Sequence, residues 1–415
     1  MAKEDIITGL DIGTTTIRVA VGKKGDAEQG LNIIGISEQP AEGVSKGVVT
    51  SIEDAVSSVS AALVAAERMT GVPVEHAFIG MNGGNLSSQE GHGVVAVAKA
   101  NGEIQEDDVE RAIEAAQTVS APPNHEILHV IPRSFTVDNQ HGIKDPIGMS
   151  GIRLEVDAQI ILALSSQVKN IQKVIFRTGI DIDDIVLGIL ASSEAVLTKR
   201  QKELGVALVN IGSSTTSMMV FEEGDVIHTA IIPIGSGHIT NDVAIGLRTS
   251  IDIAERIKIE HGTALAKDIS KHDEIDLASY SEQEAGVVSR KHVAEIIEAR
   301  LEEIYKMIDK ELDTCERSGL LPGGIVFTGG GAKLPGIVEV AKTTLKLPAS
   351  IGLPQEKIIT AIDKARDPIF ATAIGLVAWG AALTADEAGS VFGGGMKSVG
   401  AASDKVKKWF KSLLP

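Results

Sequence analysis

Two similar strand–turn–strand stretches constrain the fold of this chain more than any other part of its sequence. The first is GLDIGTTT at residues 9–16, and the second is VNIGSSTT at residues 209–216. In each, an apolar run leads to an Asx residue, a glycine and small hydroxyl residues, and a second apolar run follows. This pattern predicts two β-hairpins whose tips offer backbone N–H groups and hydroxyls to a large anion. The strand-end carboxylate of Asp11 suits a hydrated Mg²⁺.

The similarity continues beyond the hairpins. After the first, a third apolar strand is expected at 31–37 and a helix at 52–70, opened by Thr50 with Glu53 three residues on. After the second, a strand is expected at 226–234 and a helix at 239–247. This order predicts an internal duplication. A single glycine and hydroxyl turn of this kind usually binds no ligand. Two such turns, each followed by a strand and a helix, favour a pair of tips that hold the phosphates of one nucleotide from both sides.

The composition limits the classes of function. A chain of 415 residues is too long for one hydrophobic core, so two domains or one bilobed α/β unit are expected. The formal net charge of −17 and the aromatic content of 3% argue against nucleic acid as a partner, because phosphates repel an acidic surface and few rings remain for base stacking. The single Cys315 suits a reducing compartment. The longest apolar run, 369–383, is too short to span a bilayer and is expected to be a buried helix.

The pattern changes between the two repeats. Asn82 to Asn85 read as a loop that leaves the first unit. The elements expected after it are a strand at 93–98, a helix at 105–119 and strands at 127–137 and 154–164. They predict a compact α+β insertion.

Three further features involve charged residues or glycines. Glu194, shortly before the second tip, can orient a water for attack on a γ-phosphate, although a helical Glu is more often simply exposed. Glu255 and Lys258 have the spacing of a surface ion pair on a helix. Three glycines at 329–331 end a strand, where they allow a flat ligand such as a nucleoside to approach, or form a plain turn.

The C-terminal segment differs from the rest. Residues from about 387 to 403 are rich in Gly, Ala and Ser, as in a flexible linker. As a helix, DKVKKWFKSLLP at 404–415 has one apolar face surrounded by lysines, which predicts attachment to an anionic membrane surface. The residues expected to touch the membrane are Lys405, Val406, Lys408, Trp409, Phe410, Lys411, Leu413 and Leu414. The alternative is a helix that docks on the chain's own core or on a partner.

The motifs together resemble a known superfamily. The two tips, the loop at 234–237, the glycines at 327–331 and the helix at 367–375 are similar to the five nucleotide-site motifs of actin, sugar kinases and heat-shock chaperones. The whole chain resembles the FtsA family of bacterial cell-division proteins more closely. The segments that carry this resemblance are HVIP at 129–132, GIKDP at 142–146, GMSG at 148–151, LASS at 190–193 and the tethered C-terminal helix.

The resemblance implies a bilobed actin-like ATPase fold, made of duplicated RNase H-like units with an inserted α+β subdomain. The implied parts are 1–84 with 165–198 and 366–384 as the first core subdomain, 85–164 as the insertion, 199–239 with 306–365 as the second core subdomain, 240–305 as a small peripheral subdomain, 385–403 as the linker and 404–415 as the membrane helix. The family binds ATP with Mg²⁺, forms actin-like protofilaments at the membrane, and receives the C-terminal tail of FtsZ on the peripheral subdomain. The resemblance therefore implies a peripheral protein at the division site, on the cytoplasmic side of the bacterial membrane, that also meets other cell-division proteins.

The resemblance also assigns roles by position. Asp11 would hold Mg²⁺ through water, and Asn210, which lacks the carboxylate, would do so less well. The catalytic candidate remains Glu194, from its place before the second tip. The residues implied for nucleotide binding are Asp11, Gly13, Thr14, Thr15, Thr16, Asn210, Gly212, Ser213, Ser214, Thr215, Gly235, Glu255, Lys258, Gly329, Gly330 and Gly331.

The second tip departs from the superfamily pattern. The superfamily usually has Asp followed by Gly-Gly-Gly-Thr, whereas this chain has Asn210 followed by Ile211 and Gly-Ser-Ser-Thr. An amide in place of a carboxylate removes one negative charge from the water shell of Mg²⁺. Thr16 stands where many relatives carry a Lys. Our hypothesis is that ATP binds but is hydrolysed very slowly or not at all, and acts as a structural ligand.

Two alternatives remain at this point. One is a PilM-like scaffold of type IV pilus assembly, which shares the inserted subdomain but as a rule lacks such a tail. The other is a soluble ATPase or kinase of the same superfamily. A kinase needs a base aimed at a substrate hydroxyl, and no Asp-bearing motif can be assigned to that role.

Overall fold

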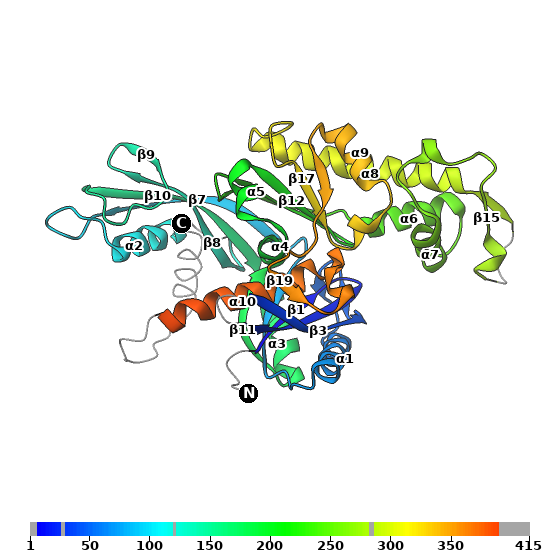
Figure 1. Cartoon of the computed structure of the whole chain (residues 1–415), viewed down its shortest axis with the longest axis horizontal. Coiled ribbons are helices and arrows are strands. Elements are labelled where there is room, and N and C mark those ends of the chain that lie inside the picture. Colours follow the sequence, from blue (N-terminus) through cyan, green and yellow to red (C-terminus); the bar gives the residue numbers. More distant parts are fainter. Residues whose placement is uncertain (1–5, 26–29, 119–121, 282–285, 390–415) are drawn as a thin grey trace.

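The computed structural model describes residues 6–25, 30–118, 122–281 and 286–389. A six-stranded sheet in the order β11-β6-β1-β2-β3-β19 lies at the bottom of the molecule as seen in Figure 1. Its strands are β1 (Ile6–Ile12), β2 (Thr16–Lys24), β3 (Leu31–Pro40), β6 (His76–Met81), β11 (Asp181–Leu187) and β19 (Ile358–Thr360). β1 and β2 form the first predicted hairpin, and β6 pairs with β1 in parallel.

Helices cover both faces of this sheet. α1 (Ile52–Thr70) and α3 (Ser165–Thr178) lie on one face, and α10 (Ala371–Gly389) crosses the other. α1 forms as predicted, because its small and branched side chains recur every three or four residues and are buried against the sheet. Its N-cap is Ser51 and not Thr50, since the Ser51 hydroxyl directly precedes the helix and accepts the Asp54 N–H at 3.4 Å.

A second sheet lies above the first, with strand order β14-β13-β12-β17-β18. Its strands are β12 (Val206–Ile211), β13 (Thr216–Glu222), β14 (Asp225–Ile232), β17 (Ile325–Thr328) and β18 (Ala349–Ile351). The long helix α8 (Arg290–Thr314) and α9 (Ile337–Leu345) pack over its outer face. There the fully buried Tyr305 donates its hydroxyl to the carbonyl of Ile337 at 2.6 Å, and its ring lies 5.5 Å from that of Phe327.

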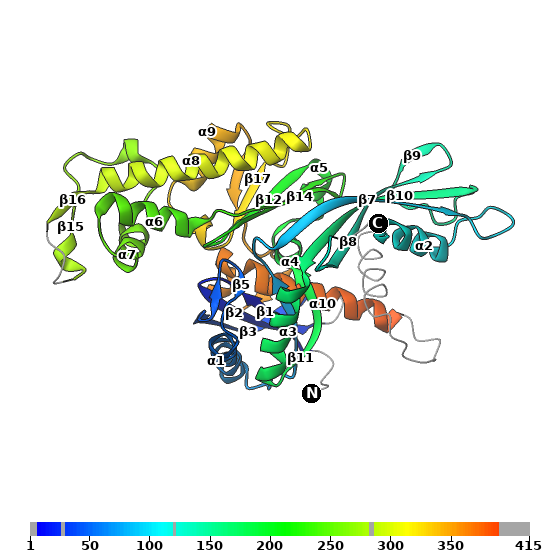
Figure 2. The ribbon, with the colours of Figure 1, turned by 180° about the vertical axis from the view of Figure 1, so that it is seen from behind.

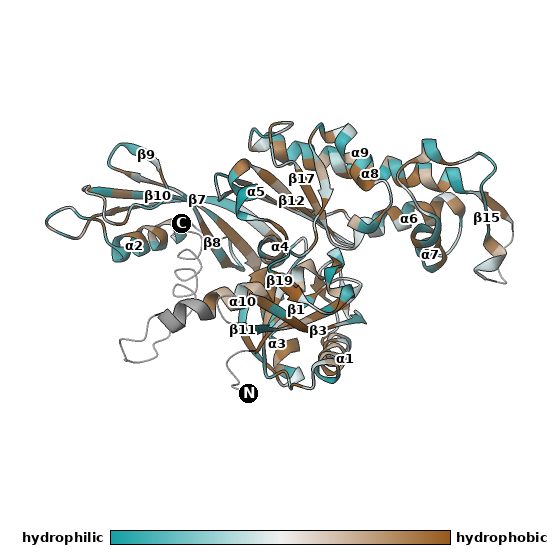
Figure 3. Ribbon diagram, in the orientation of Figure 1, coloured by the Kyte–Doolittle hydropathy of each residue, from teal (hydrophilic) through white to brown (hydrophobic). Residues whose placement is uncertain are grey.

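The two sheets confirm the predicted duplication. The order β3-β2-β1-β6-β11 and the order β14-β13-β12-β17-β18 have the same sequence of antiparallel and parallel pairs. The strands of both sheets are mainly hydrophobic, as Figure 3 shows. The inner face of the second sheet, including Leu208, Met219 and Phe221, shares a core with the first sheet. The two units therefore form one bilobed body.

Two helical segments connect the units. α4 (Gly188–Val196) leads from the first sheet toward the second, and α10 follows the second unit back. They pack closely, because a Cβ built on Gly375 would lie 2.0 Å from the carbonyl oxygen of Ala191. A short helix that sequence did not predict, α5 (Lys199–Leu204), follows α4 with a capping box between Thr198 and Gln201.

The predicted α+β insertion forms a four-stranded sheet in the order β7-β10-β8-β9 with one helix on it. The elements are β7 (Leu86–Ala96), α2 (Glu106–Gln117), β8 (His125–Val137), β9 (Gln140–Ile143) and β10 (Arg153–Leu164). It has a core of its own, which includes Val109, Phe135 and Leu154. Lys144 of the GIKDP motif links the insertion to the second lobe, since its ammonium donates to the carbonyl of Glu223 and lies 3.5 Å from Asp225.

The peripheral subdomain lies at the other end of the second sheet, as Figures 1 and 2 both show. Besides the first part of α8, it contains α6 (Ser236–Leu247), α7 (Ile251–His261), β15 (Glu274–Asp276) and β16 (Val287–Ser289). Within the four described ranges, no helix is both long and apolar enough to cross a membrane. α10 continues to Gly389, into the range expected for the linker.

His129, from the HVIP motif, fastens the root of the insertion to the first lobe. Its Nε2 accepts the backbone N–H of Leu187 at 2.9 Å, and its ring meets that of Trp379 edge-on at 6.0 Å. Burial disfavours the charged imidazolium and lowers the pKa of His129 to about 4.

We expect His129 to make the protein sensitive to acid. In the unfolded chain, His129 takes up a proton below its ordinary pKa of about 6.5, whereas in the folded protein it does so only near pH 4. The free energy of unfolding therefore falls by about 3 kcal/mol as the pH drops through this interval. His129→Gln keeps an acceptor for Leu187 but cannot be protonated. Measured by urea unfolding, the free energy of unfolding of His129→Gln should fall by about 2 kcal/mol less than that of the wild type between about pH 6.5 and 5. An unchanged pH dependence in His129→Gln would contradict this assignment.

Candidate functional site

The two hairpin tips have the same backbone geometry. In the first, the N–H of Gly13 donates to the carbonyl of Thr16 at 3.1 Å, and in the second, the N–H of Gly212 donates to Thr215 at 2.9 Å. Each turn contains four residues between the last pair of its hairpin, which is Ile12↔Ile17 in the first and Ile211↔Thr216 in the second. The register therefore places Asp11 and Asn210 at equivalent positions, one residue before the last pair of each hairpin.

The strand-end Asx residues of both units approach the start of α10. The amide of Asn210 donates to the hydroxyl of Thr372 at 3.3 Å, and Ser192 of α4 lies 3.0 Å from the same hydroxyl. On the first unit, a Cβ built on Gly80 would lie 3.3 Å from Thr372 and 3.6 Å from Asp11 Oδ1. Thr372 thus contacts Asn210 directly and lies close to Gly80, the strand partner of Asp11, so the two predicted residues Asp11 and Asn210 lie near one another.

Asp11 supplies the carboxylate at the end of the first strand pair. It is 6% exposed, and burial raises its pKa to about 6, against the opposing effects of Arg18 and of a hydrogen bond from Asn82. Arg18 does not pair with it directly; its guanidinium binds Glu38 at 2.9 Å. A carboxylate that is buried without a direct cationic partner gains from a bound cation, so Asp11 fits the Mg²⁺ role expected of it.

Both tips present backbone donors. Among the described residues, the N–H groups of Thr14, Thr15, Ser213 and Ser214 donate no hydrogen bond, so these amides are available to an anion. The hydroxyl of Thr14 accepts the N–H of Gly47 at 3.0 Å, which holds the first tip in place.

The start of α6 supports the second tip. The N–H groups of Ser236 and Gly237 donate to the carbonyls of Gly212 and Ser213, both at 2.8 Å. A Cβ on Gly235 would lie 2.5 Å from the carbonyl oxygen of Gly212. Gly235 is therefore explained by close packing of this loop on the tip.

Glu255 and Lys258 lie beside the same helix start. They form the predicted ion pair at 2.6 Å, but the side chain of Lys258 is only 10% exposed, so this is not a plain surface pair. Its ammonium also donates to the hydroxyl of Thr240 at 2.8 Å and lies 3.5 Å from the carbonyl of Ser236. Thr240, which sequence reasoning did not select, joins this cation to α6.

The triple glycine follows β17 and lies against the second tip. Gly329 has φ of +84°, and a Cβ there would lie 2.2 Å from Asn210 Oδ1. A Cβ on Gly331 would lie 2.4 Å from Ile211, whereas one on Gly330 would meet no atom within 4 Å. Packing explains two of the three glycines, and Gly330 alone leaves open space.

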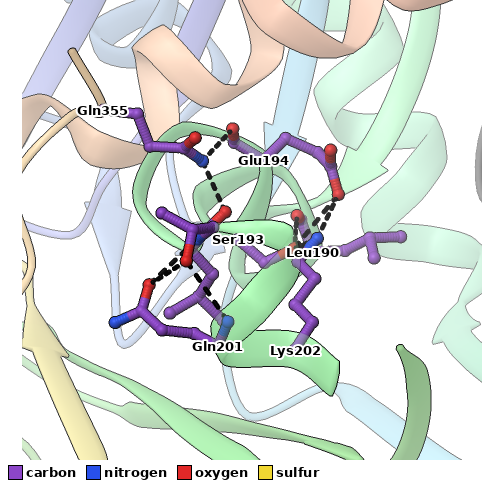
Figure 4. Close-up of polar contacts among 8 residues, drawn as sticks. Leu190, Ser193, Glu194, Gln201, Lys202 and Gln355 are labelled. Atoms are coloured by element: carbon purple, nitrogen blue, oxygen red, sulfur yellow. Dashed lines mark hydrogen bonds and ion pairs between the residues drawn. The ribbon is translucent and has the colours of Figure 1, made fainter. Parts of the chain in front are cut away.

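Glu194 lies on α4 and is held by an ion pair (Figure 4). Its Oε1 accepts from the ammonium of Lys202 at 2.7 Å, and its backbone carbonyl accepts from Gln355 at 3.3 Å. Burial is the largest single effect and opposes ionisation, but the charge and hydrogen bond of Lys202, with smaller contributions from Lys357 and Ser193, together hold the pKa of Glu194 below its ordinary value. This arrangement gives Glu194 a structural role, and the catalytic interpretation stays a prediction.

Removing the partner of Glu194 should destabilise the protein. In Lys202→Met the alkyl stem remains beside Phe221, but Glu194 loses its cation, so we expect a loss of about 3 kcal/mol in urea unfolding. The double variant Lys202→Met/Glu194→Gln should recover most of this loss, because no unpaired charge remains. A single variant as stable as the wild type would show that the pair does not contribute.

Sequence reasoning missed two polar residues at the centre of the site, Asn82 and Thr372. Asn82 opens the glycine-containing loop after β6, as Gly329 to Gly331 open the loop after β17, so the duplication itself was the available signal. Thr372 lies within the apolar run 369–383, and no pattern in the sequence marks it as a site residue. The predicted membrane residues Lys405, Val406, Lys408, Trp409, Phe410, Lys411, Leu413 and Leu414 lie outside the described residues.

Comparison with known sequences gives consistent matches along the chain. The family model described as "Cell division protein FtsA" matches residues 207–375, and "SHS2 domain inserted in FTSA" matches residues 83–162. The chain is 39% identical to cell division protein FtsA of Pseudomonas aeruginosa over 376 residues, covering 90% of this chain and 89% of that protein. It is also 39% identical to FtsA of Bacillus subtilis over 377 residues, covering 91% and 84%.

Solved structures resemble this chain at lower sequence identity. The PilM–PilN complex of type IV pilus biogenesis matches with a TM-score of 0.67 and 14% identity, over 90% of this chain and 98% of that one. MreB5 of Spiroplasma citri bound to AMPPNP matches with a TM-score of 0.54 and 12% identity, over 93% and 99%. These likenesses confirm the bilobed actin-like fold.

Proposed function

This chain belongs to the FtsA family of cell division proteins, and we propose that it is an ATP-binding, actin-like protein that polymerises on the inner face of the cytoplasmic membrane and tethers FtsZ filaments to it. The observation that carries the nucleotide part is the pair of matching tips whose strand ends meet at Thr372. The PilM alternative shares the fold only.

In this proposal, ATP lies between the two tips, and the free amides of both tips hold its phosphates. Asp11 holds the water shell of Mg²⁺, which neutralises phosphate charge, and Asn210 has a weaker share because it is uncharged. Lys258 and Glu255 reach the nucleoside, and the open space at Gly330 receives its base. The other residues proposed at this site are Gly13, Thr14, Thr15, Thr16, Gly212, Ser213, Ser214, Thr215, Gly235, Gly329 and Gly331.

Asn210 should keep hydrolysis slow. Its neutral amide contacts Thr372, and a Cβ on the neighbouring Gly329 would lie 2.2 Å from its Oδ1, so the residue packs closely against Gly329 but adds no charge. Asn210→Asp should therefore raise ATP turnover, roughly tenfold, by restoring a second carboxylate to the water shell of the metal. Phosphate release from matched amounts of both proteins measures this. Faster turnover by the wild type would contradict the proposal.

Membrane attachment is proposed for residues 404–415 on the basis of their sequence pattern, four lysines around an apolar face. The peripheral subdomain at 240–305 is proposed to receive the C-terminal tail of FtsZ. Because one short helix binds lipid weakly, self-association into protofilaments would supply the several copies that stable attachment needs. Other cell-division proteins would then be recruited at the same membrane site.

Co-sedimentation with anionic liposomes, in ATP and Mg²⁺, tests the tethering. The full chain should pellet with the liposomes and bring FtsZ with it, whereas a chain ending at Ser403 should remain in the supernatant. FtsZ without its C-terminal tail should not be brought down, and zwitterionic liposomes should bind the full chain less. Equal behaviour of the full and shortened chains would contradict the membrane role of this segment.

A further inference from the structure

Asn82 connects the end of β6 to the strand-end carboxylate of the first tip. Its Nδ2 donates to Asp11 Oδ1 at 2.9 Å, across 71 residues of sequence. No described residue donates a hydrogen bond to the other carboxylate oxygen, Oδ2. The amide thus fixes one oxygen of Asp11 and leaves the second one available.

The start of α4 is shaped around Asn82. A Cβ built on Gly188, the first residue of α4, would lie 2.0 Å from Oδ1 of Asn82, 2.7 Å from its Cγ and 2.8 Å from its Nδ2. These are the three nearest atoms, so the space that a side chain at 188 would fill is the space that the Asn82 amide occupies. Asn82 is therefore confined between Asp11 and α4.

The second unit has no such arrangement. β1 and β6 align Asp11 with Gly80, and β12 and β17 align Asn210 with Thr328, so the counterpart of Asn82 is Gly330. A Cβ at Gly330 would meet nothing within 4 Å. Asp11, the carboxylate of the first unit, is therefore held by a side chain that follows the adjoining strand β6. Asn210 in the second unit has no such partner after β17, because its counterpart of Asn82 is a glycine.

We propose that Asn82 is a positioning residue for the divalent cation of the nucleotide site, and that Gly188 is required because it gives Asn82 its place. The amide holds Oδ1 of Asp11 and leaves Oδ2, which would accept a hydrogen bond from the water shell of the cation. Neutral partners of this kind orient carboxylates without competing for the cation. The inference rests on the proposed binding of ATP with Mg²⁺.

The test uses the full chain and a fluorescent ATP analogue, titrated once in EDTA and once at increasing Mg²⁺. Asn82→Ala should raise the Mg²⁺ concentration at half-maximal binding roughly tenfold and leave the affinity in EDTA within about twofold of the wild type. Gly188→Ala should do the same, because its new methyl displaces the Asn82 amide. Asn82→Ala/Gly188→Ala should be no worse than either single variant, since the clash is gone. Asn32→Ala, an exposed Asn on β3, is the matched control.

Three outcomes would overturn the inference. Asn82→Ala with the Mg²⁺ dependence of the wild type would remove Asn82 from the cation site. An equal loss of affinity in EDTA and in Mg²⁺ would mean a structural role only. Additive effects in the double variant would show that Gly188 does not act through Asn82. A wild type that binds no nucleotide in either buffer would contradict the proposed function itself. The first three outcomes contradict only the role of Asn82 or Gly188, because they require a wild type that binds.

Discussion

Asp11→Asn is expected to raise the stability of the ligand-free protein and at the same time to remove its Mg²⁺-dependent affinity for ATP. Burial raises the pKa of Asp11 from 3.8 to about 6, so at neutral pH the folded state holds a carboxylate that is less favourable there than in the unfolded chain. This destabilisation is complete above about pH 6 and disappears below the unfolded value, and it amounts to about 3 kcal/mol. An amide keeps the acceptor for Asn82 but carries no charge.

Urea unfolding at neutral pH measures the first effect, and nucleotide titration with and without Mg²⁺ measures the second. Stability should rise by up to about 3 kcal/mol, and affinity in Mg²⁺ should fall at least roughly tenfold toward its value in EDTA. The exposed Asp313→Asn, at the end of α8, is the control for loss of one negative charge. A less stable Asp11→Asn protein would contradict the burial argument, and unchanged Mg²⁺ dependence would contradict the metal role.

Gly375→Ala is expected to be the most destabilising glycine substitution among the connections between the lobes. Its new Cβ would lie 2.0 Å from the carbonyl oxygen of Ala191, 2.4 Å from its carbonyl carbon and 2.9 Å from the nitrogen of Ser192. All three are backbone atoms of α4, so α4 and α10 must move apart. Overpacking of this kind costs about 3 kcal/mol, although alanine is the better helix former.

The same substitution should weaken nucleotide binding, because Thr372, Ser192 and Asn210 meet one helical turn away from Gly375. Thermal unfolding and ATP titration of the same preparation measure both effects. Gly84→Ala is the matched control, since a Cβ there meets nothing within 4 Å and the residue has no positive φ. A Gly375→Ala protein as stable as Gly84→Ala would show that the helices can separate at no cost.

The parts of the fold that sequence predicted are those with local signals. The bounds of α1 agree with the prediction because its apolar residues recur regularly along nineteen residues, and Gly71 ends it with φ of +70°. The hairpins followed from apolar runs that flank a glycine turn. The predicted bounds are wrong where the local sequence fits both a loop and a helix. α6, for example, begins at Ser236, three residues before the predicted start, because its first residues resemble a loop.

The centre of the site required contacts that no local pattern contains. Asn82 reaches Asp11 across 71 residues, and Asn210 reaches Thr372 across 162 residues. The duplication predicted which tips would be equivalent, but not that α10 would place a hydroxyl between their strand ends. The partial burial of Glu194 beside Lys202 likewise depends on the unpredicted helix α5.

If both tips hold one nucleotide, a negative charge placed on either tip should weaken its binding. Thr15→Asp and Ser214→Asp each change one tip residue whose N–H has no described partner, and Ser87→Asp on β7 is the control. Either tip variant should lower ATP affinity at least roughly tenfold, because the new carboxylate repels the phosphates, while Ser87→Asp should bind like the wild type. Normal affinity in either tip variant would contradict the claim, since that tip would then not touch the nucleotide.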